Sequence, residues 1–525
     1  MSRGGREVVL IGCGEPSGRI APAQQIGFKA HNLARMAALG LPVPPAFVLG
    51  TGWCACPQDL RREHWQPGLR ALEAQSGLGF GDARRPLLLS VRSGAPVSMP
   101  GMLQTLLDVG LTEHTLPGLV RVTGNPRLAW DAYRRLIAGY GEVVLGVPPE
   151  AFEADLRQVA AGDDEHQLDF ARLRELARLH RETVEREAHV PFPQDPVAQL
   201  EGAIGAVFAS WWSDKARAWR ALRALPDGMG TAVTVQRMVF GNAGGTSGAG
   251  VGFTRHPATG EPVPWVDFLF NAQGEDVVSG RRSAAGHEEL AAVLPDVWAA
   301  LVEGGRKLER ALGDMQDLEF TVQEGRLFML QTRTGKRTPQ AAARIALDLR
   351  DEHVIGRREA LERTKGLDAA ALSQLELAGE DGAAPLASGL SASAGVVSGP
   401  IALDEPAARA CAGRGSPAVL VRAQAETADI VALDCAAGLL TRRGARTSHA
   451  AVVARQLGKV CVVGCEALEI DLQARRIRIG AREFGEFELL SLDGHTGAVF
   501  AGAVRTVRRE PVDLLQRLEA LRQMS

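Results

Sequence analysis

The sequence lacks paired cysteine motifs, long apolar runs and an excess of charge of either sign. Its seven cysteines form no C-x-x-C pair, and the Cys54/Cys56 and Cys461/Cys465 spacings differ from those of common zinc sites, so we expect free thiols. No run of about 18 uncharged apolar residues occurs, which argues against a membrane span. The net charge of -3 argues against a nucleic-acid partner. Together these absences predict a cytoplasmic protein.

Internal repeats and long low-complexity segments are also missing, so the chain is expected to be globular. Its 525 residues exceed the roughly 250 to 300 that one hydrophobic core supports, which predicts two to four domains. Strand-like runs alternate with helical patterns, which favours an α/β fold. A helix is expected over 29–40, with further helices over about 125–225. The expected strands are 87–91, 232–240, 317–322 and 327–331.

The segment 378–385 (AGEDGAAP) has little to bury and is predicted to be a flexible linker before a second domain. A helix beginning at Thr338-Pro339 is predicted to open a connector. The predicted organisation is therefore a large domain over 1–340, a helical connector and linker over 341–385, a compact domain over 386–504 and a charged helical tail over 505–525.

Two carboxylates lie on one face of the expected strand 317–322. Because strand side chains alternate, Asp317 and Glu319 share a face while the apolar residues between them point to the core. Glu324-Gly325 can form a hairpin turn, and the carboxylates could then hold Mg²⁺ against nucleotide phosphates. For a single D-x-E pattern, a solvated strand face is the commoner explanation.

A glycine-rich segment, 241–250, follows the expected strand 232–240 and would let backbone approach phosphates closely. A flexible hairpin explains it equally well. Lys29 and Arg92 are the cations that could clamp a triphosphate, although each by itself would be read as a surface charge.

His449 follows a predicted buried strand (438–441) and a glycine turn, and it precedes an Ala/Val helix. Thr447 or Ser448 can cap that helix, which places the imidazole near its positive end. A histidine there has a lowered pKa, and a phosphoryl group on it would meet backbone N–H groups and Arg446. On spacing alone, a histidine that packs against its neighbours and has no chemical role is the more frequent outcome.

Several segments together resemble the pyruvate phosphate dikinase family, over nearly the whole chain. The nucleotide-domain signature resembles SVRSGAPVSMPGMLQTLLDVGL (90–111), and Gly27-Phe28-Lys29 stands where the family has Gly-Gly-Lys. Its ATP-grasp half is similar to 231–261, 271–280 and MQDLEFTVQEGRLFMLQTRTGKRT (315–338). Its phosphohistidine swivel domain is similar to LSASAGVVSGP (390–400), TSHAAVVARQLGK (447–459) and LLSLDGHTGAVF (489–500).

The resemblance implies a role for each matched residue, with ATP as substrate and Mg²⁺ as cofactor. His449 would carry the phosphoryl group, with Arg333 and Arg337 as catalytic phosphate-binding residues. Asp317 and Glu319 would also hold the metal, and Thr447 would be a regulatory site. The residues expected to bind nucleotide are Lys29, Arg92, Gln236, Gly244, Gly245, Asp317, Glu319 and Gln331.

The implied chemistry is phosphorylation of the histidine by ATP and inorganic phosphate, with AMP and pyrophosphate as products. After Phe500 the sequence is shorter than the roughly 250 residues of a TIM-type barrel, so we expect the family's phosphoenolpyruvate/pyruvate barrel to be absent or supplied by a separate protein. The alternatives are a water-using phosphoenolpyruvate synthase-like enzyme and a nucleotide-binding regulatory or phospho-relay module. The sequence leaves open the final acceptor, the direction of reaction and the oligomeric state, a homo-oligomer included.

Overall fold

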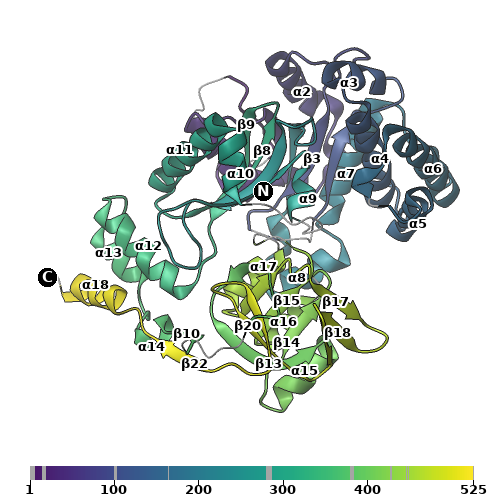
Figure 1. The fold of residues 1–525 in the computed structure, drawn as a ribbon. Helices are drawn as coiled ribbons and strands as arrows, with labels where there is room; N and C mark the ends of the chain where they lie inside the picture. Colours follow the sequence, from purple (N-terminus) through teal and green to yellow (C-terminus); the bar gives the residue numbers. More distant parts are fainter. Residues whose placement is uncertain are drawn as a thin grey trace. The chain divides into compact units, whose positions relative to one another are not determined.

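The computed structural model describes residues 6–14, 19–97, 99, 103–163, 165–278, 286–378, 384–425, 429–444, 446 and 449–523. Figure 1 colours the chain from purple at its N-terminus to yellow at its C-terminus. The chain forms two compact units, 1–244 with 328–332 and 245–327 with 333–525. Among the described residues no helix is both long enough and apolar enough to cross a membrane.

The first unit is built on an antiparallel five-stranded sheet of order β1-β2-β5-β3-β4. Its strands are β1 (Val8–Ile11), β2 (Ala46–Leu49), β3 (Leu89–Gly94), β4 (Thr105–Val109) and β5 (Ala232–Arg237). Its α-helices are α1 (Ala23–Ala38), α2 (Arg62–Ser76), α3 (Leu116–Thr123), α4 (Pro126–Val143), α5 (Pro149–Ala160), α6 (Phe170–Ala188), α7 (Pro196–Ser210) and α8 (Asp214–Leu222).

The helices over 126–222 begin where their sequence supplies caps. The side chains of Asn125, Asp169, Asp195 and Ser213 each accept a hydrogen bond from a backbone N–H in the first turn of α4, α6, α7 and α8. Such caps satisfy N–H groups that have no partner inside the helix. The helical character expected for 125–225 is therefore confirmed.

The second unit contains a four-stranded sheet of order β7-β6-β8-β9, and the middle of β9 counts with the first unit. The strands are β6 (Gly248–Phe253), β7 (Trp265–Phe270), β8 (Gln316–Gln323) and β9 (Arg326–Thr334), with helices α9 (Gly274–Val278), α10 (His287–Val293) and α11 (Pro295–Leu312). Glu324 and Gly325 join β8 to β9 with φ angles of 50° and 72°. Two positive φ values are typical of the type I′ turn, so the predicted hairpin is confirmed.

A second sheet in this unit has the order β11-β21-β20-β13-β14-β15-β16-β12. Its core is parallel, because α15, α16 and α17 connect β13 to β14, β15 and β16 in turn. Its strands are β11 (Ala387–Ser388), β12 (Leu390–Ser393), β13 (Val396–Ala402), β14 (Val419–Arg422), β15 (Gly438–Thr441), β16 (Val460–Val463), β20 (Leu489–Asp493) and β21 (Ala498–Ala501). The connecting helices are α15 (Glu405–Gly413), α16 (Ile430–Cys435) and α17 (His449–Gln456), and a small sheet is formed by β17 (Leu468–Asp471), β18 (Arg476–Ile479) and β19 (Arg482–Gly485).

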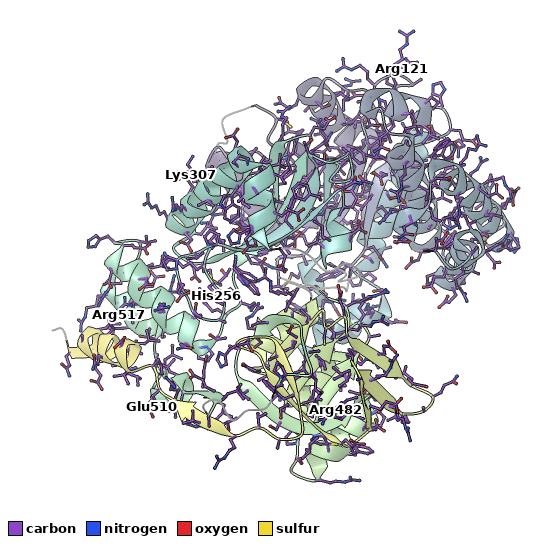
Figure 2. All side chains as sticks on the ribbon, viewed as in Figure 1. Arg121, His256, Lys307, Arg482, Glu510 and Arg517 are labelled. Carbon is purple, nitrogen blue, oxygen red and sulfur yellow. The ribbon has the colours of Figure 1, made fainter. Side chains whose placement is uncertain are left out.

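The predicted connector and tail fold together rather than separately. Helices α12 (Pro339–Asp351), α13 (Arg357–Arg363) and α14 (Ala369–Leu372) share an apolar cluster with α18 (Val512–Gln523) through Leu514, Leu518 and Leu521. Arg517 of α18, labelled in Figure 2, donates to Asp348 of α12 at 2.7 Å.

The tail was predicted to be one charged helix over 505–525, and this prediction is wrong. Its first part is the strand β22 (Thr506–Arg509), which pairs with β10 (Gln374–Leu377) in the connector. This pairing joins segments far apart in the sequence, and Pro511 then precedes α18. The α/β class is confirmed, and the strands expected at 87–91, 232–240, 317–322 and 327–331 correspond to β3, β5, β8 and β9 with shifted ends.

Candidate functional site

Four of the residues expected to bind nucleotide line one small pocket of the first unit: Lys29, Arg92, Gln236 and Gln331. Lys29 comes from α1, Arg92 from β3 and Gln236 from β5. Because β3 and β5 are antiparallel, Arg92 lies across from Thr234 and Ser90 across from Gln236. Two cations and two amides therefore converge, which suits an anionic ligand with hydrogen-bonding edges.

Gly27 makes this convergence possible. A β-carbon at Gly27 would lie 1.9 Å from the carbonyl oxygen of Gly94, the last residue of β3, and its φ is +79°. The N–H of Phe28 also donates to the carbonyl of Ala95 at 2.9 Å. Only glycine fits this close approach, and the approach brings Lys29 to the strand that carries Arg92.

The glycine-rich segment has two different parts. A β-carbon at Gly244 or Gly245 would have no neighbouring atom within 4 Å, and Gly244 has a φ of +124°. At Gly248 and Gly250, both in β6, a β-carbon would lie 2.2 and 2.3 Å from the rings of Phe268 and Phe320. Gly248 and Gly250 thus serve sheet packing, whereas Gly244 and Gly245 leave backbone open for a phosphate.

The register of the second unit's sheet puts three carboxylates on one face. Val251 of β6 pairs with both Asp267 of β7 and Glu319 of β8. Asp317 is two residues from Glu319 along β8, and side chains two apart share a face. Asp267 and Asp317 are almost fully buried, with 1% and 6% of their side chains exposed.

Asp317 is paired with Arg333 of β9, whose Nε donates to it at 2.7 Å. Burial raises the pKa of the Asp317 carboxyl, and the positive charge of Arg333 limits that rise. Two carboxylates on one strand face are hard oxygen donors of the kind Mg²⁺ uses together with phosphate oxygens. The residues present at Asp317 and Glu319 therefore fit the expected metal.

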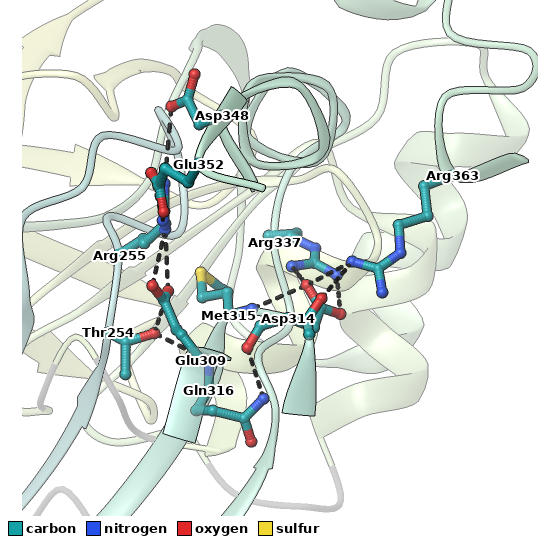
Figure 3. A network of polar contacts seen from close by, with 11 residues as sticks. Thr254, Arg255, Glu309, Asp314, Met315, Gln316, Arg337, Asp348, Glu352 and Arg363 are labelled. Atoms are coloured by element: carbon teal, nitrogen blue, oxygen red, sulfur yellow. Dashed lines mark hydrogen bonds and ion pairs between the residues drawn. The ribbon is translucent and has the colours of Figure 1, made fainter. Parts of the chain in front are cut away.

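Arg337 is held in a different set of contacts. Its guanidinium donates to both carboxylate oxygens of Asp314, with the Nη2–Oδ2 pair at 2.6 Å, and Arg363 of α13 lies 3.5 Å from the same carboxylate (Figure 3). Arg333 and Arg337 thus bind different partners. The expected phosphate-binding role of Arg337 stays a prediction.

The helix that begins at His449 lies against the carboxylate face of the sheet. Arg446, just before α17, contacts Asp267 through Nε and Nη2, both at 3.0 Å, and lies over the ring of Trp265 at 4.9 Å. Arg455 of α17 lies over Trp265 and Phe253 at 5.1 and 5.5 Å. Two arginines therefore dock the α17 segment onto β6 and β7.

Arg455 also links α17 to its own sheet. It donates two hydrogen bonds to the carbonyl of Ala392, at 2.6 and 3.1 Å, and a third to the carbonyl of Arg446. Burial lowers its pKa to about 10, so it remains a cation at neutral pH. The positive charge of Arg455 also keeps the pKa of the Asp317 carboxyl lower than burial alone would.

Three of these residues were missed by the sequence reasoning: Asp267, Trp265 and Arg455. A carboxylate in the apolar strand Trp265–Phe270 is unusual enough to have marked Asp267 as a site residue. Thr447, Ser448 and Ala445 lie outside the described residues, so the predicted cap and regulatory site stay predictions.

Two family models match the chain. The model described as "Pyruvate phosphate dikinase, AMP/ATP-binding domain" matches residues 57–287 and 283–353, and "PEP-utilising enzyme, mobile domain" matches 415–497. These matches define the class, an ATP-binding protein with the domains of a phosphoenolpyruvate-utilising phosphotransferase.

The chain belongs to the pyruvate phosphate dikinase family. It is 40% identical over 529 residues to the pyruvate, phosphate dikinase of Rhizobium meliloti, covering 96% of this chain and 58% of that protein. It is 41% identical over 498 residues to the enzyme of Clostridium symbiosum, covering 92% and 56%. For pyruvate, phosphate dikinase 2 of Zea mays the values are 41% over 512 residues, 95% and 58%.

The chain thus spans a little over half the length of these relatives. The comparison covers only the matched part of these relatives and says nothing of any further domain. The expectation that the phosphoenolpyruvate/pyruvate barrel is absent is therefore not supported.

Proposed function

We propose that this chain performs the nucleotide half-reaction of a pyruvate phosphate dikinase, in which ATP and inorganic phosphate phosphorylate His449. The observation that carries the proposal is the docking of α17 by Arg446 and Arg455 onto the sheet face that holds Asp317 and Glu319. This docking supports the proposal, because α17 begins at His449 and lies against the sheet face whose carboxylates suit a metal–nucleotide complex. The proposed architecture is an ATP-grasp domain followed by a phosphohistidine swivel domain.

In the proposed reaction an imidazole nitrogen of His449 attacks the β-phosphorus of ATP. The bond between that phosphorus and the α–β bridging oxygen breaks, and AMP leaves with the oxygen. An oxygen of inorganic phosphate then attacks the γ-phosphorus. The bond from the γ-phosphorus to the β–γ bridging oxygen breaks, which releases pyrophosphate and leaves one phosphoryl group on His449.

The nucleotide-binding residues and Arg333 each have a proposed part in holding the substrates. Lys29 and Arg92 neutralise the triphosphate, Gln236 and Gln331 hydrogen-bond the nucleotide, and the open backbone of Gly244 and Gly245 approaches the phosphates. Arg333 orients Asp317 through its hydrogen bond and also binds phosphate. Mg²⁺ at Asp317 and Glu319 would neutralise charge on the transferring phosphates.

Product analysis with ATP labelled at the γ-phosphorus tests this assignment and separates it from the water-using alternative. With added phosphate, the proposal predicts that the label leaves as pyrophosphate with an equal amount of AMP, and that His449→Ala produces neither. Release of the label as inorganic phosphate with AMP, independent of added phosphate, would instead identify a water-using enzyme.

A further inference from the structure

The sheet that carries Asp267, Asp317 and Glu319 also borders a cavity on its other face. Its volume is about 340 Å³, and Val266 of β7 and Leu318 of β8 contribute to its wall. Each of these residues is next in sequence to a carboxylate, Asp267 or Asp317, and neighbouring strand residues point to opposite faces. The cavity is therefore separate from the proposed nucleotide site.

Apolar residues form about half of the wall of this cavity, and charged residues contribute much of the rest. The wall is formed by the underside of the sheet, by α11, by the loop before β7 and by the segment after α12. Its apolar lining residues are Pro262, Pro264, Val266, Leu301, Val302, Leu318 and Val354, with Phe253 at the end of β6. A volume of this size matches the lower end of the range for small-molecule sites.

The two carboxylates in the cavity wall are already bound to a buried arginine. Arg255, with 3% of its side chain exposed, donates through Nε to Glu309 at 2.9 Å and through Nη2 to Glu352 at 2.8 Å. Glu309 also accepts from the hydroxyl of Thr254 at 2.7 Å (Figure 3). Arg255 therefore offsets only one of these two negative charges.

Two further arginines on the wall have no such partner. Arg306 and Arg310 are one turn apart on α11, both exposed and both lining the cavity. Within the described part of the chain, neither guanidinium takes part in a hydrogen bond or ion pair. Positions i and i+4 share a helix face, so the two cations stand side by side at the rim of the pocket, next to its apolar residues.

We infer that this cavity is a binding site for a small organic anion with an apolar body, such as an aromatic carboxylate or sulfonate. The apolar part fills the space between α11 and the sheet, and the anionic group binds Arg306 and Arg310. The inference stands independently of the phosphotransfer reaction, because it uses the opposite face of the sheet.

The probe 8-anilinonaphthalene-1-sulfonate has this chemistry, and its fluorescence rises when its rings leave water. We would titrate it into the full chain with a non-hydrolysable Mg·ATP analogue at saturating concentration, so that the nucleotide site is filled. The variants are Arg306→Gln/Arg310→Gln, which removes both rim cations, and Val302→Trp, which fills the cavity. Lys307→Gln is the matched control, because Lys307 is exposed on α11 but does not line the cavity (Figure 2).

The expected result is saturable binding of one probe per chain, weakened about tenfold in Arg306→Gln/Arg310→Gln, abolished in Val302→Trp and unchanged in Lys307→Gln. Added salt should weaken wild-type binding. Circular dichroism melts confirm that each variant is folded. Absence of saturable binding, equal affinity in Arg306→Gln/Arg310→Gln, or displacement of the probe by nucleotide would overturn the inference.

Discussion

Removing Arg446 is the sharpest test of the docking geometry. The Arg446→Gln change deletes the ion pair to Asp267 and the cation–π contact with Trp265. Breaking a fully buried ion pair costs about 3 to 5 kcal/mol. The cost here is smaller, because the Arg446 side chain is 21% exposed and Arg455 remains near Asp267.

We therefore expect the free energy that stabilises the docked position of α17 to fall by about 2 kcal/mol, and part of this loss comes from the cation–π contact. This corresponds to a fall in the rate of His449 phosphorylation of up to about 30-fold. ATP affinity should stay unchanged, because Arg446 is outside the pocket formed by Lys29 and Arg92.

Rapid-quench single turnovers with ATP labelled at the β-phosphorus measure the rate, and calorimetry measures the affinity. Arg443→Gln is the control, since Arg443 is exposed and lies three residues earlier. The Asp267→Asn/Arg446→Gln double variant should be no slower than Arg446→Gln, because the two residues act through one contact. A wild-type rate for Arg446→Gln, or a loss of ATP affinity in place of rate, would refute the reasoning.

Three other predictions follow from the described contacts. Gly27→Ala should lower the unfolding free energy in urea by at least about 2 kcal/mol more than Gly40→Ala, because both glycines have positive φ but only Gly27 meets Gly94; equal losses would contradict the close approach. Arg337→Gln should lower stability by about 2 kcal/mol, because its guanidinium is bound to Asp314, and the predicted phosphate-binding role requires the labelling rate of the folded protein to fall as well; normal stability would contradict the first expectation and an intact labelling rate the second. Burial lowers the pKa of His180 to about 4, so the unfolded chain takes up this proton first as the pH falls below about 6.5. Stability should therefore drop by about 3 kcal/mol between pH 6.5 and 4 from this residue, and urea titrations of His180→Leu should show a shallower acid loss; parallel pH curves would exclude that contribution.

The elements that the sequence predicted well are those whose signals are local. The β8–β9 hairpin follows from alternation on both strands and from a two-residue turn at Glu324-Gly325, and β15 follows from an apolar run before Gly444. The convergence of Lys29, Arg92 and Gln331 was expected only through the family resemblance, because no local pattern relates α1, β3 and β9.

The features that the sequence did not predict depend on contacts between distant segments. Arg446 and Asp267 are 179 residues apart, and neither residue's neighbours indicate the other. The strand β22 was read as helix because its pairing partner, β10, lies in the connector. The contact of Arg337 with Asp314, which precedes β8, was also not predicted, and the phosphate-binding role of Arg337 stays a prediction.

The central claim is that His449 accepts the β-phosphoryl group of ATP. The most direct measurement is incubation of the chain with inorganic phosphate and ATP labelled at the β-phosphorus, followed by digestion and localisation of the label. The account predicts one acid-labile, base-stable phosphoryl group per chain on the peptide that contains His449, and none in His449→Ala. An unlabelled wild-type chain, or the same label on His449→Ala, would contradict it.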